Sequence, residues 1–578
     1  MINPLKLIFR TNADGTTSAS TTMSSVTAQR EKEIGVPAKK VVPIVFIPGI
    51  MGTNLWNTRT KKIAWIAPNT DSILLKISAL GTAISAFFST AKDRQNDLDA
   101  SDGVITVYQD GPIGSDGLIN PISKEELKRR GWGGIMRSAY HPIMVQMQNE
   151  MNSIMNNGVT QDWWKTHSEH SPADWGDWKS NPSLSELNDS EGLKHCSEIR
   201  YEVWAAGYNW LQSNGDSARD IKRYIDKTVL PSYPTADRVI IVTHSMGGLV
   251  ARAMVGIHEY QNILGIIHGA MPATGAPAAY RRIRAGFEGN GKPDGYLARL
   301  ILGPTAADTV AVLAYSRGGL ELLPSADYDD GNKWLFARRE KKEKTNNQIK
   351  TEEECTEHVE FISLPTAGDP YKDIYKSDKW WGLIPRENEH LIDPNEFYKT
   401  QSTEDWAHTP SKREIFEDNI SLVKIFHDGI KTAYHGSTYV HYSAEAQEED
   451  LATWGNIVWT SDWTGWGDIP NAKITDDDMT GNIVLDAGYK FGFGPKNSPG
   501  DGTVPMVSSA SSRNHRNVQA AFAHGKNSST FPDACKNGLY NDSHGYEHQS
   551  SYNDPEGRTL FATLYSIVRI STDVKVND

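Results

Sequence analysis

The chain contains 578 residues, 38% of them hydrophobic, and it carries a formal charge of −13 at pH 7. This length exceeds that of one ordinary domain, so we expect either several domains or one core that carries long insertions, and we favour insertions. The acidic balance leaves no basic stripe to neutralise phosphates, which argues against a nucleic-acid partner and a polybasic membrane anchor. No charge-free apolar run is long enough to span a bilayer.

The cysteines and the start of the chain bear on where the protein works. Cys196, Cys355 and Cys535 are widely spaced and form no C-x-x-C pair, so they predict neither a disulfide framework nor a zinc site. Residues 1–29 lack the charged start, long apolar run and small-residue cleavage site of a secretory signal peptide. If the protein acts outside the cell that makes it, we expect a route other than general secretion.

The first predicted strand, residues 41–47, runs into the glycine-containing loop 48–53. In an α/β-hydrolase a loop of this kind donates a backbone N–H to the oxyanion hole, and its glycines let the chain approach the reacting carbonyl. Ile50 is the predicted donor. A plain glycine turn that closes a strand is an equally good interpretation of this loop taken alone.

Residues 56–200 are irregular and too long to connect two core elements, so we interpret them as an insertion. Within it, residues 73–88 (ILLKISALGTAISAFF) are strongly apolar but interrupted by Lys76 and Gly81. This length and these breaks predict an interfacial or buried helix rather than a membrane span. A second helix is predicted to begin near Pro142.

From residue 201 the chain alternates between strand and helix, which is typical of a parallel sheet. The predicted elements are a strand at 201–206, an amphipathic helix at 214–230, a strand at 239–242, a helix from 249 and a strand at 263–268.

The central feature of this region is a buried strand that ends at a serine and turns directly into a helix. Residues 239–242 form an unbroken β-branched run, as in a strand covered on both faces, and two glycines follow the serine. This context is the one that a nucleophile elbow requires. Ser245 is therefore the predicted nucleophile, and the amide of Met246 is the predicted second oxyanion donor. Thr243 replaces the first glycine of G-x-S-x-G, so the turn must accept a β-branched residue.

A second insertion is predicted after the motif MPATGAP. Its short apolar segments, 297–302 and 310–315, are predicted to form two lid helices, and the mixed-charge run 338–354 is assigned no function. Further strands are predicted at 359–364 and 438–442, followed by a pair at 457–459 and 483–485.

A serine alone is a poor nucleophile and needs a general base that a carboxylate orients. In α/β-hydrolases the order along the chain is serine, acid, histidine. Asp501, in the glycine turn GDGTVP, is the predicted acid, ahead of Asp486, which follows a strand but lacks such a turn. His548, which precedes a predicted final helix at 559–570, is the predicted base. His544 lies four residues away and stays an alternative.

Several motifs occur together between about residues 44 and 570: PIVFIPGIMGTNLW, RGWGGIM, YNWLQSN, THSMGG, MPATGAP, GGLELLP, GDGTVP and GYEHQ. This set resembles the lecithin:cholesterol acyltransferase-like and GPI-inositol deacylase-like lipases and, more closely, the phospholipase effectors of bacterial type VI secretion, their fourth lipase class. The resemblance implies a Ser-Asp-His triad on Ser245, Asp501 and His548, cap modules over the site, no metal or cofactor, and a dedicated immunity protein.

We therefore predict an α/β fold, with an α/β-hydrolase core of mostly parallel sheet flanked by helices and two cap insertions. The predicted divisions are a discontinuous core at 1–60, 196–275 and 355–578, a first cap at 61–195 and a second cap or lid at 276–354.

The predicted activity is hydrolysis of the acyl esters of membrane phospholipids. The predicted role is that of an antibacterial toxin, which a dedicated secretion machine delivers to the periplasm or membrane of a target cell. Acyl transfer from the same acyl-enzyme to an alcohol, and a hydrolase-fold binding protein without turnover, are the alternatives.

The apolar segments of the two insertions, residues 73–88 and 297–315, are predicted to form a lid that covers Ser245 in water and opens at lipid. A protein in water cannot leave a large apolar patch exposed without risking aggregation, so the patch is expected to fold over the site. A cap core that never moves is the alternative.

Overall fold

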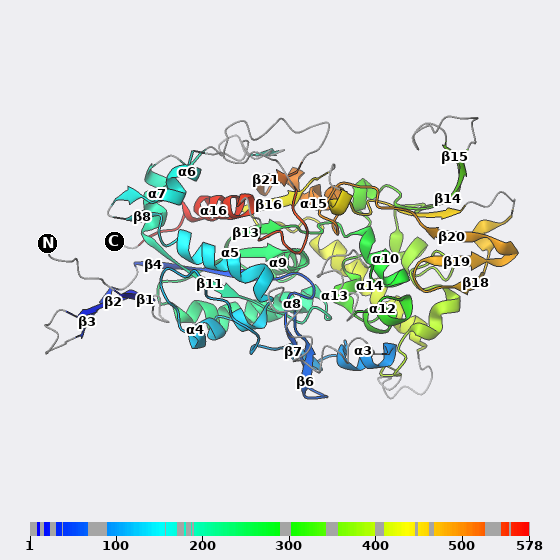
Figure 1. Cartoon of the computed structure of the whole chain (residues 1–578), viewed down its shortest axis with the longest axis horizontal. Helices are drawn as coiled ribbons and strands as arrows, with labels where there is room; N and C mark the ends of the chain where they lie inside the picture. Colours follow the sequence, from blue (N-terminus) through cyan, green and yellow to red (C-terminus); the bar gives the residue numbers. More distant parts are fainter. Residues whose placement is uncertain are drawn as a thin grey trace.

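Figure 1 shows the computed structural model of the chain. The predicted apolar segments 73–88 and 297–301 lie outside the residues that it describes, as do Cys355, Cys535 and His544. The described residues are 8–11, 17–22, 31–36, 39–67, 90–156, 158–169, 179–180, 186–187, 190–288, 302–342, 356–398, 410–445, 449–461, 467–525, 545–553 and 557–576.

A seven-stranded sheet forms the centre of the fold, and six of its strands run parallel. The short strand β10 pairs antiparallel with β21 at one edge. This arrangement confirms the predicted α/β fold class. In spatial order the strands are β10 (Lys179–Ser180), β21 (Val518–His524), β16 (Thr438–Ser443), β13 (Ile263–Gly269), β12 (Val239–His244), β4 (Lys40–Ile47) and β11 (Ile199–Ala205).

The chain order of these strands creates a switch point beside β12. From β4 the chain crosses to β11 on one side and then returns to β12 on the other side of β4. In open α/β sheets the crevice at the carboxyl ends of such strands is the usual ligand site. Ser245 follows β12 directly, so the predicted nucleophile lies at this crevice.

Two groups of helices flank the sheet. Every residue of β12 is buried, so both of its faces are covered, which accounts for its run of β-branched residues. One group packs around α9 and the other around α16 (Figure 1). The first group is α8 (Asn214–Tyr224, continued by a π-helical turn at Ile225–Val229), α9 (Gly247–Gly256) and α14 (Lys412–Ile430); the second is α5 (Arg137–Glu150), α7 (Ser190–Ser197) and α16 (Arg558–Ser571).

The segment predicted as a first cap contributes to this central layer. It supplies α5, which packs on β11, as well as α7 and the edge strand β10. It also supplies most of a small sheet and helix α3, which contacts α12. The small sheet consists of β5 (Leu55–Asn57), β6 (Lys62–Trp65) and β7 (Ile105–Val107), of which β5 precedes the predicted cap. The two helices are α3 (Ala91–Asp97) and, from the predicted second cap, α12 (Ala306–Leu313).

A second sheet of six strands lies at the end of the molecule opposite the two termini (Figure 1). The strands predicted at 457–459 and 483–485 are both in it, but β20 separates them. The predicted boundary at residue 354 falls between β14 and β15, which pair antiparallel. In order the strands are β15 (Thr356–Leu364), β14 (Leu335–Lys342), β17 (Ile457–Ser461), β20 (Lys490–Phe493), β19 (Asn482–Leu485) and β18 (Ile474–Asp477).

The remaining described elements are short. Helix α12 overlaps the second predicted lid helix, begins four residues earlier than predicted, and packs on α10. No helix in the described ranges is long and apolar enough to cross a bilayer. The other elements are β1 (Ile8–Thr11), β2 (Thr17–Thr22), β3 (Glu31–Val36), β8 (Met155–Asn156), β9 (Val159–Thr160), α4 (Lys124–Arg129), α6 (Asp162–His167), α10 (Pro277–Ala285), α13 (Arg317–Leu320) and α15 (Met506–Ser509).

Several buried histidines make the stability of this fold depend on pH. Burial lowers the pKa of His141 and His427 to about 4 and that of His268 and His441 to about 3. Below pH 6.5 the unfolded chain therefore takes up protons that the folded chain does not. Stability from these groups is complete above that pH and is lost as the pH falls, by about 1.4 kcal/mol per histidine and pH unit.

We expect the thermal midpoint to fall between pH 7 and pH 5, although the raised pKa values of His548 and Glu321 oppose part of this change. His427→Gln should flatten the pH dependence of the thermal midpoint, because glutamine does not titrate. Its amide can still accept from the Tyr371 hydroxyl and donate to the Glu321 carbonyl, so the buried hydrogen bonds are kept. Scanning fluorimetry across pH measures the slope. His390→Gln, at an exposed position, is the control, and an equal effect of both substitutions would contradict the assignment.

Candidate active site

Ser245 occupies a strained turn between β12 and α9. Its φ of 51° is in the left-handed region, which residues other than glycine rarely adopt. The Ser245 amide donates to the Gly269 carbonyl at 2.9 Å, and the Ser245 carbonyl accepts from the Gly248 amide at 2.9 Å. A Cβ on Gly247 would lie 2.5 Å from the Pro48 carbonyl oxygen, so a side chain there would push the neighbouring loop away. This is the geometry of a nucleophile elbow.

The structure shows how the turn accepts Thr243 in place of glycine. The threonine is fully buried, and its hydroxyl forms a 3.0 Å hydrogen bond with Nδ1 of His268 on the adjacent strand β13. Its carbonyl accepts from the Tyr552 hydroxyl at 2.9 Å. The polar atoms of Thr243 are therefore paired, and the larger side chain causes no unsatisfied buried group.

Three side chains that are distant in the sequence form one hydrogen-bonded row. His548 Nε2 lies 2.8 Å from Ser245 Oγ, and His548 Nδ1 lies 2.7 Å from Asp501 Oδ2. An ionised carboxylate only accepts, so Nδ1 carries the proton and Nε2 of the neutral ring accepts from the serine hydroxyl. Burial disfavours the charged imidazolium, but the Asp501 carboxylate outweighs burial, and the pKa of His548 is raised above its ordinary value.

Asp501 is held so that one oxygen faces the histidine. Its other oxygen, Oδ1, accepts from the amides of Thr503 at 3.0 Å and Val504 at 2.7 Å. The His548 amide also donates to the Asp501 carbonyl, at 2.9 Å. The rival acid Asp486 is exposed and accepts from the Lys473 amide in the second sheet, so it does not contribute to this site.

The two amides predicted to form an oxyanion hole lie beside Ser245. Ile50 lines the same pocket as the serine, and Met246 is the N-cap of α9. Within the described ranges, neither amide has a hydrogen-bond partner. A Cβ on Gly49 would lie 2.8 Å from Ser245 Cβ, which shows how closely this loop approaches the serine. Both amides can therefore donate to a ligand oxygen that binds near the N-terminal, positive end of α9.

Two residues that we did not single out from the sequence connect these parts. Burial lowers the pKa of His244 far below its ordinary value, so the ring is neutral. Its Nε2 donates to the His548 carbonyl at 2.9 Å, and its Nδ1 accepts from the Tyr140 hydroxyl at 2.9 Å. The Tyr140 oxygen in turn accepts from the Gly49 amide at 3.3 Å. One chain of hydrogen bonds therefore joins the Gly49 loop, β12 and the His548 loop.

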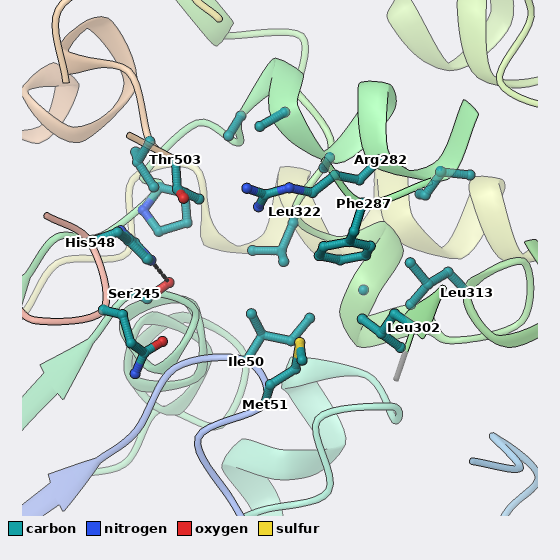
Figure 2. A pocket seen from close by; sticks show the side chains of 18 of the residues that line it. Ile50, Met51, Ser245, Arg282, Phe287, Leu302, Leu313, Leu322, Thr503 and His548 are labelled. Atoms are coloured by element: carbon teal, nitrogen blue, oxygen red, sulfur yellow. Dashed lines mark hydrogen bonds between the residues drawn. The ribbon is translucent and has the colours of Figure 1, made fainter. Parts of the chain in front are cut away.

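A pocket with a volume of about 180 Å³ opens at Ser245. Figure 2 shows that Leu302 and Leu313 lie at one end of it, while Thr503 and His548 lie at the other. In the described part of the chain, no cluster of His, Cys, Asp and Glu side chains has the geometry to hold a metal ion. The remaining apolar lining includes Ile50, Met51, Ile283, Phe287 and Leu322.

Comparisons with known proteins agree with this architecture. The model of the PGAP1-like alpha/beta domain matches residues 194–289, which include the Ser245 elbow. A solved structure, described as the crystal structure of the Tle4–Tli4 complex, matches with a TM-score of 0.75 and 34% sequence identity. The match covers 92% of this chain and 99% of the other.

The chain belongs to the Tle4 family of type VI secretion lipase effectors. This membership confirms the resemblance noted from the sequence motifs and makes the protein a lipase-type hydrolase. A search of curated proteins gives no significant match.

We expect Tyr140→Phe to lower kcat for ester hydrolysis by roughly 10- to 100-fold, because small displacements of reacting groups have effects of this size. The substitution removes the acceptor of the Gly49 amide and the donor to His244. Tyr208→Phe is the matched control, since this buried hydroxyl donates to the Pro48 carbonyl in the same loop but does not contact His244. Thermal midpoints and kcat should be measured for both. Equal kcat losses would show that the Tyr140 bonds serve only stability.

Proposed function

We propose that the protein hydrolyses acyl esters of membrane phospholipids with Ser245 as nucleophile, His548 as general base and Asp501 as the residue that orients the histidine. The observation that carries this proposal is the continuous row from Ser245 Oγ through His548 to Asp501, placed at a strained elbow beside an apolar pocket. A binding protein without turnover has no need of a left-handed serine aligned with a buried base and acid.

The geometry supports a two-step acyl transfer. Ser245 Oγ attacks the ester carbonyl while His548 Nε2 takes its proton, and the oxyanion accepts hydrogen bonds from the Ile50 and Met246 amides. The tetrahedral intermediate collapses as His548 returns the proton to the alcohol of the departing lysophospholipid. Water then attacks the acyl-enzyme by the same route and releases the fatty acid. In each step Asp501 holds the tautomer and stabilises the imidazolium.

The pocket supports a fatty acyl ester as the substrate. Its long apolar part, which ends at Leu302 and Leu313, fits a hydrocarbon chain, and its polar end surrounds the reacting groups (Figure 2). Leu313 belongs to α12, and Leu302 lies just before that helix. We therefore propose that α12 and the residues just before it, including Leu302, are part of a lid that opens at a lipid surface.

The family supports a proposal for the biological role. The related structure is a complex of Tle4 with Tli4, and we propose that this chain likewise pairs with a cognate immunity protein. In this proposal the chain is an antibacterial toxin, which the type VI secretion machinery delivers to the periplasm or membrane of a target cell.

Ser245→Ala should abolish ester hydrolysis while leaving the thermal midpoint near that of the wild type, because the hydroxyl serves the reaction rather than the core. The expected loss of kcat is about 10⁴-fold or more. Defined phospholipid vesicles, with mass spectrometry of the released fatty acids, measure the activity. Substantial residual hydrolysis by a folded variant would refute the assignment of the nucleophile.

The pH dependence tests the base. Hydrolysis needs neutral His548, so kcat/KM should fall as the pH drops through the pKa of this residue, which is raised above 6.5. Glu547→Gln should move this acid limb to lower pH, since the Glu547 carboxylate contributes to the upward shift. Glutamine can still accept from the Ser550 amide. An acid limb that does not move, or that moves upward, would contradict the assignment of His548 as the base.

A further inference from the structure

One arginine in the active-site pocket has no role in the reaction described above. Arg282 lies on α10, and its side chain is 22% exposed. Figure 2 shows its guanidinium directed toward Thr503, at the end of the pocket that holds Ser245 and His548. The charge is therefore placed where the ester group, not the acyl chain, would lie.

The contacts of Arg282 leave one of its amino groups open. Nη2 donates to Glu288 Oε1 at 2.9 Å, Nε makes a longer contact of 3.3 Å with the same oxygen, and the guanidinium lies over the Phe287 ring. Among the described residues, Nη1 of Arg282 has no hydrogen-bond partner. These contacts fix the plane of the guanidinium and leave donors that face the pocket.

The charges around Arg282 come from a second arginine and two carboxylates. Arg281 also contacts Glu288, at 3.4 Å, so two arginines share one carboxylate. Burial opposes ionisation of Glu288, but Arg282 and Arg281 outweigh it and bring its pKa to about 2. The other charged side chain of the pocket lining is Glu547, which accepts hydrogen bonds from Ser550. The two arginines and their shared carboxylate carry a net charge of +1, and the Glu547 carboxylate at the pocket offsets it.

The positive charge of Arg282 affects the protonation of the proposed base, His548. The Asp501 carboxylate raises the pKa of His548 against burial, and Arg282 opposes part of that rise and so disfavours the imidazolium that must form during the reaction. Glu288 offsets part of the desolvation free energy of this cation, and a second anion at the open Nη1 would offset more of it. Both effects are relieved when a negative group of the substrate binds to Arg282.

We propose that Arg282 binds the phosphodiester of a glycerophospholipid and selects it over neutral glycerides, an inference that rests on the proposed esterase function. In such a lipid only a few bonds separate the phosphate from the glycerol ester, so an acyl chain in the apolar part of the pocket brings the phosphate to the polar end. The planar guanidinium matches phosphate oxygens and forms charge-assisted hydrogen bonds. A neutral diacylglycerol offers no anion to the open Nη1 donor.

The test compares two lipids with identical acyl chains, phosphatidylethanolamine and diacylglycerol, presented in the same detergent micelles. We expect Arg282→Gln to lower the ratio of kcat/KM for phospholipid over diacylglycerol by roughly 10- to 100-fold, as for the loss of a hydrogen bond to a charged group. Arg282→Lys keeps the charge and should restore part of the ratio. Arg281→Gln is the matched control and should leave the ratio unchanged, because this residue contacts Glu288 without lining the pocket.

Each outcome bears on the inference. An unchanged ratio in a folded Arg282→Gln variant overturns it, because binding of a fatty-acid carboxylate or a purely structural role would affect both lipids equally. If Arg282→Gln does not fold, Arg282→Lys decides: a ratio below that of the wild type supports phosphate binding by the guanidinium fork, and a wild-type ratio overturns it. Wild-type protein that cleaves diacylglycerol but not phospholipid overturns both proposals. Wild-type protein that cleaves both lipids while the ratio stays unchanged overturns only the role of Arg282.

Discussion

The left-handed backbone at Ser245 is the constraint on which the rest of the site depends. A residue with a Cβ adopts this conformation only when its surroundings compensate the strain. Here the adjacent strands hold the turn through the bond from the Ser245 amide to the Gly269 carbonyl, and Gly247 lets the loop after β4 pass against it. The same close approach brings the Ile50 amide beside the serine, so the strained turn and the open backbone donors arise from one packing arrangement.

Around this turn, loops from distant parts of the chain meet and are connected by buried polar bonds. Ser443 Oγ donates to the Gly500 carbonyl and accepts from the Tyr546 amide, which joins the loops that carry the acid and the base. His244 and Tyr140 connect the base to the Gly49 loop. In a buried environment each of these groups would be unfavourable without its partner, so the network favours one arrangement of the loops over others.

Short-range signals in the sequence were sufficient to predict the elements at the centre of the fold. The β-branched run at 239–242 predicts a strand covered on both faces, and β12 is entirely buried. The serine that follows, the aspartate in a glycine turn and the histidine ahead of the last helix are the residues that the structure brings into one row. These features were accessible because strand burial, tight turns and helix starts depend on residues within a few positions of one another.

Short-range signals could not predict which strands pair, or which side chains meet, across long stretches of the chain. Strand β14 pairs with β17 more than a hundred residues later, so the second sheet combines a predicted cap with a predicted core segment. Tyr140 lies on a helix that the sequence places in an insertion, yet its hydroxyl contacts His244, the residue before the serine. Arg282 is one of several arginines in α10, and the sequence around these arginines does not show which one faces the pocket. Contacts of this kind depend on how separate elements pack in three dimensions, and no local preference of the chain encodes them.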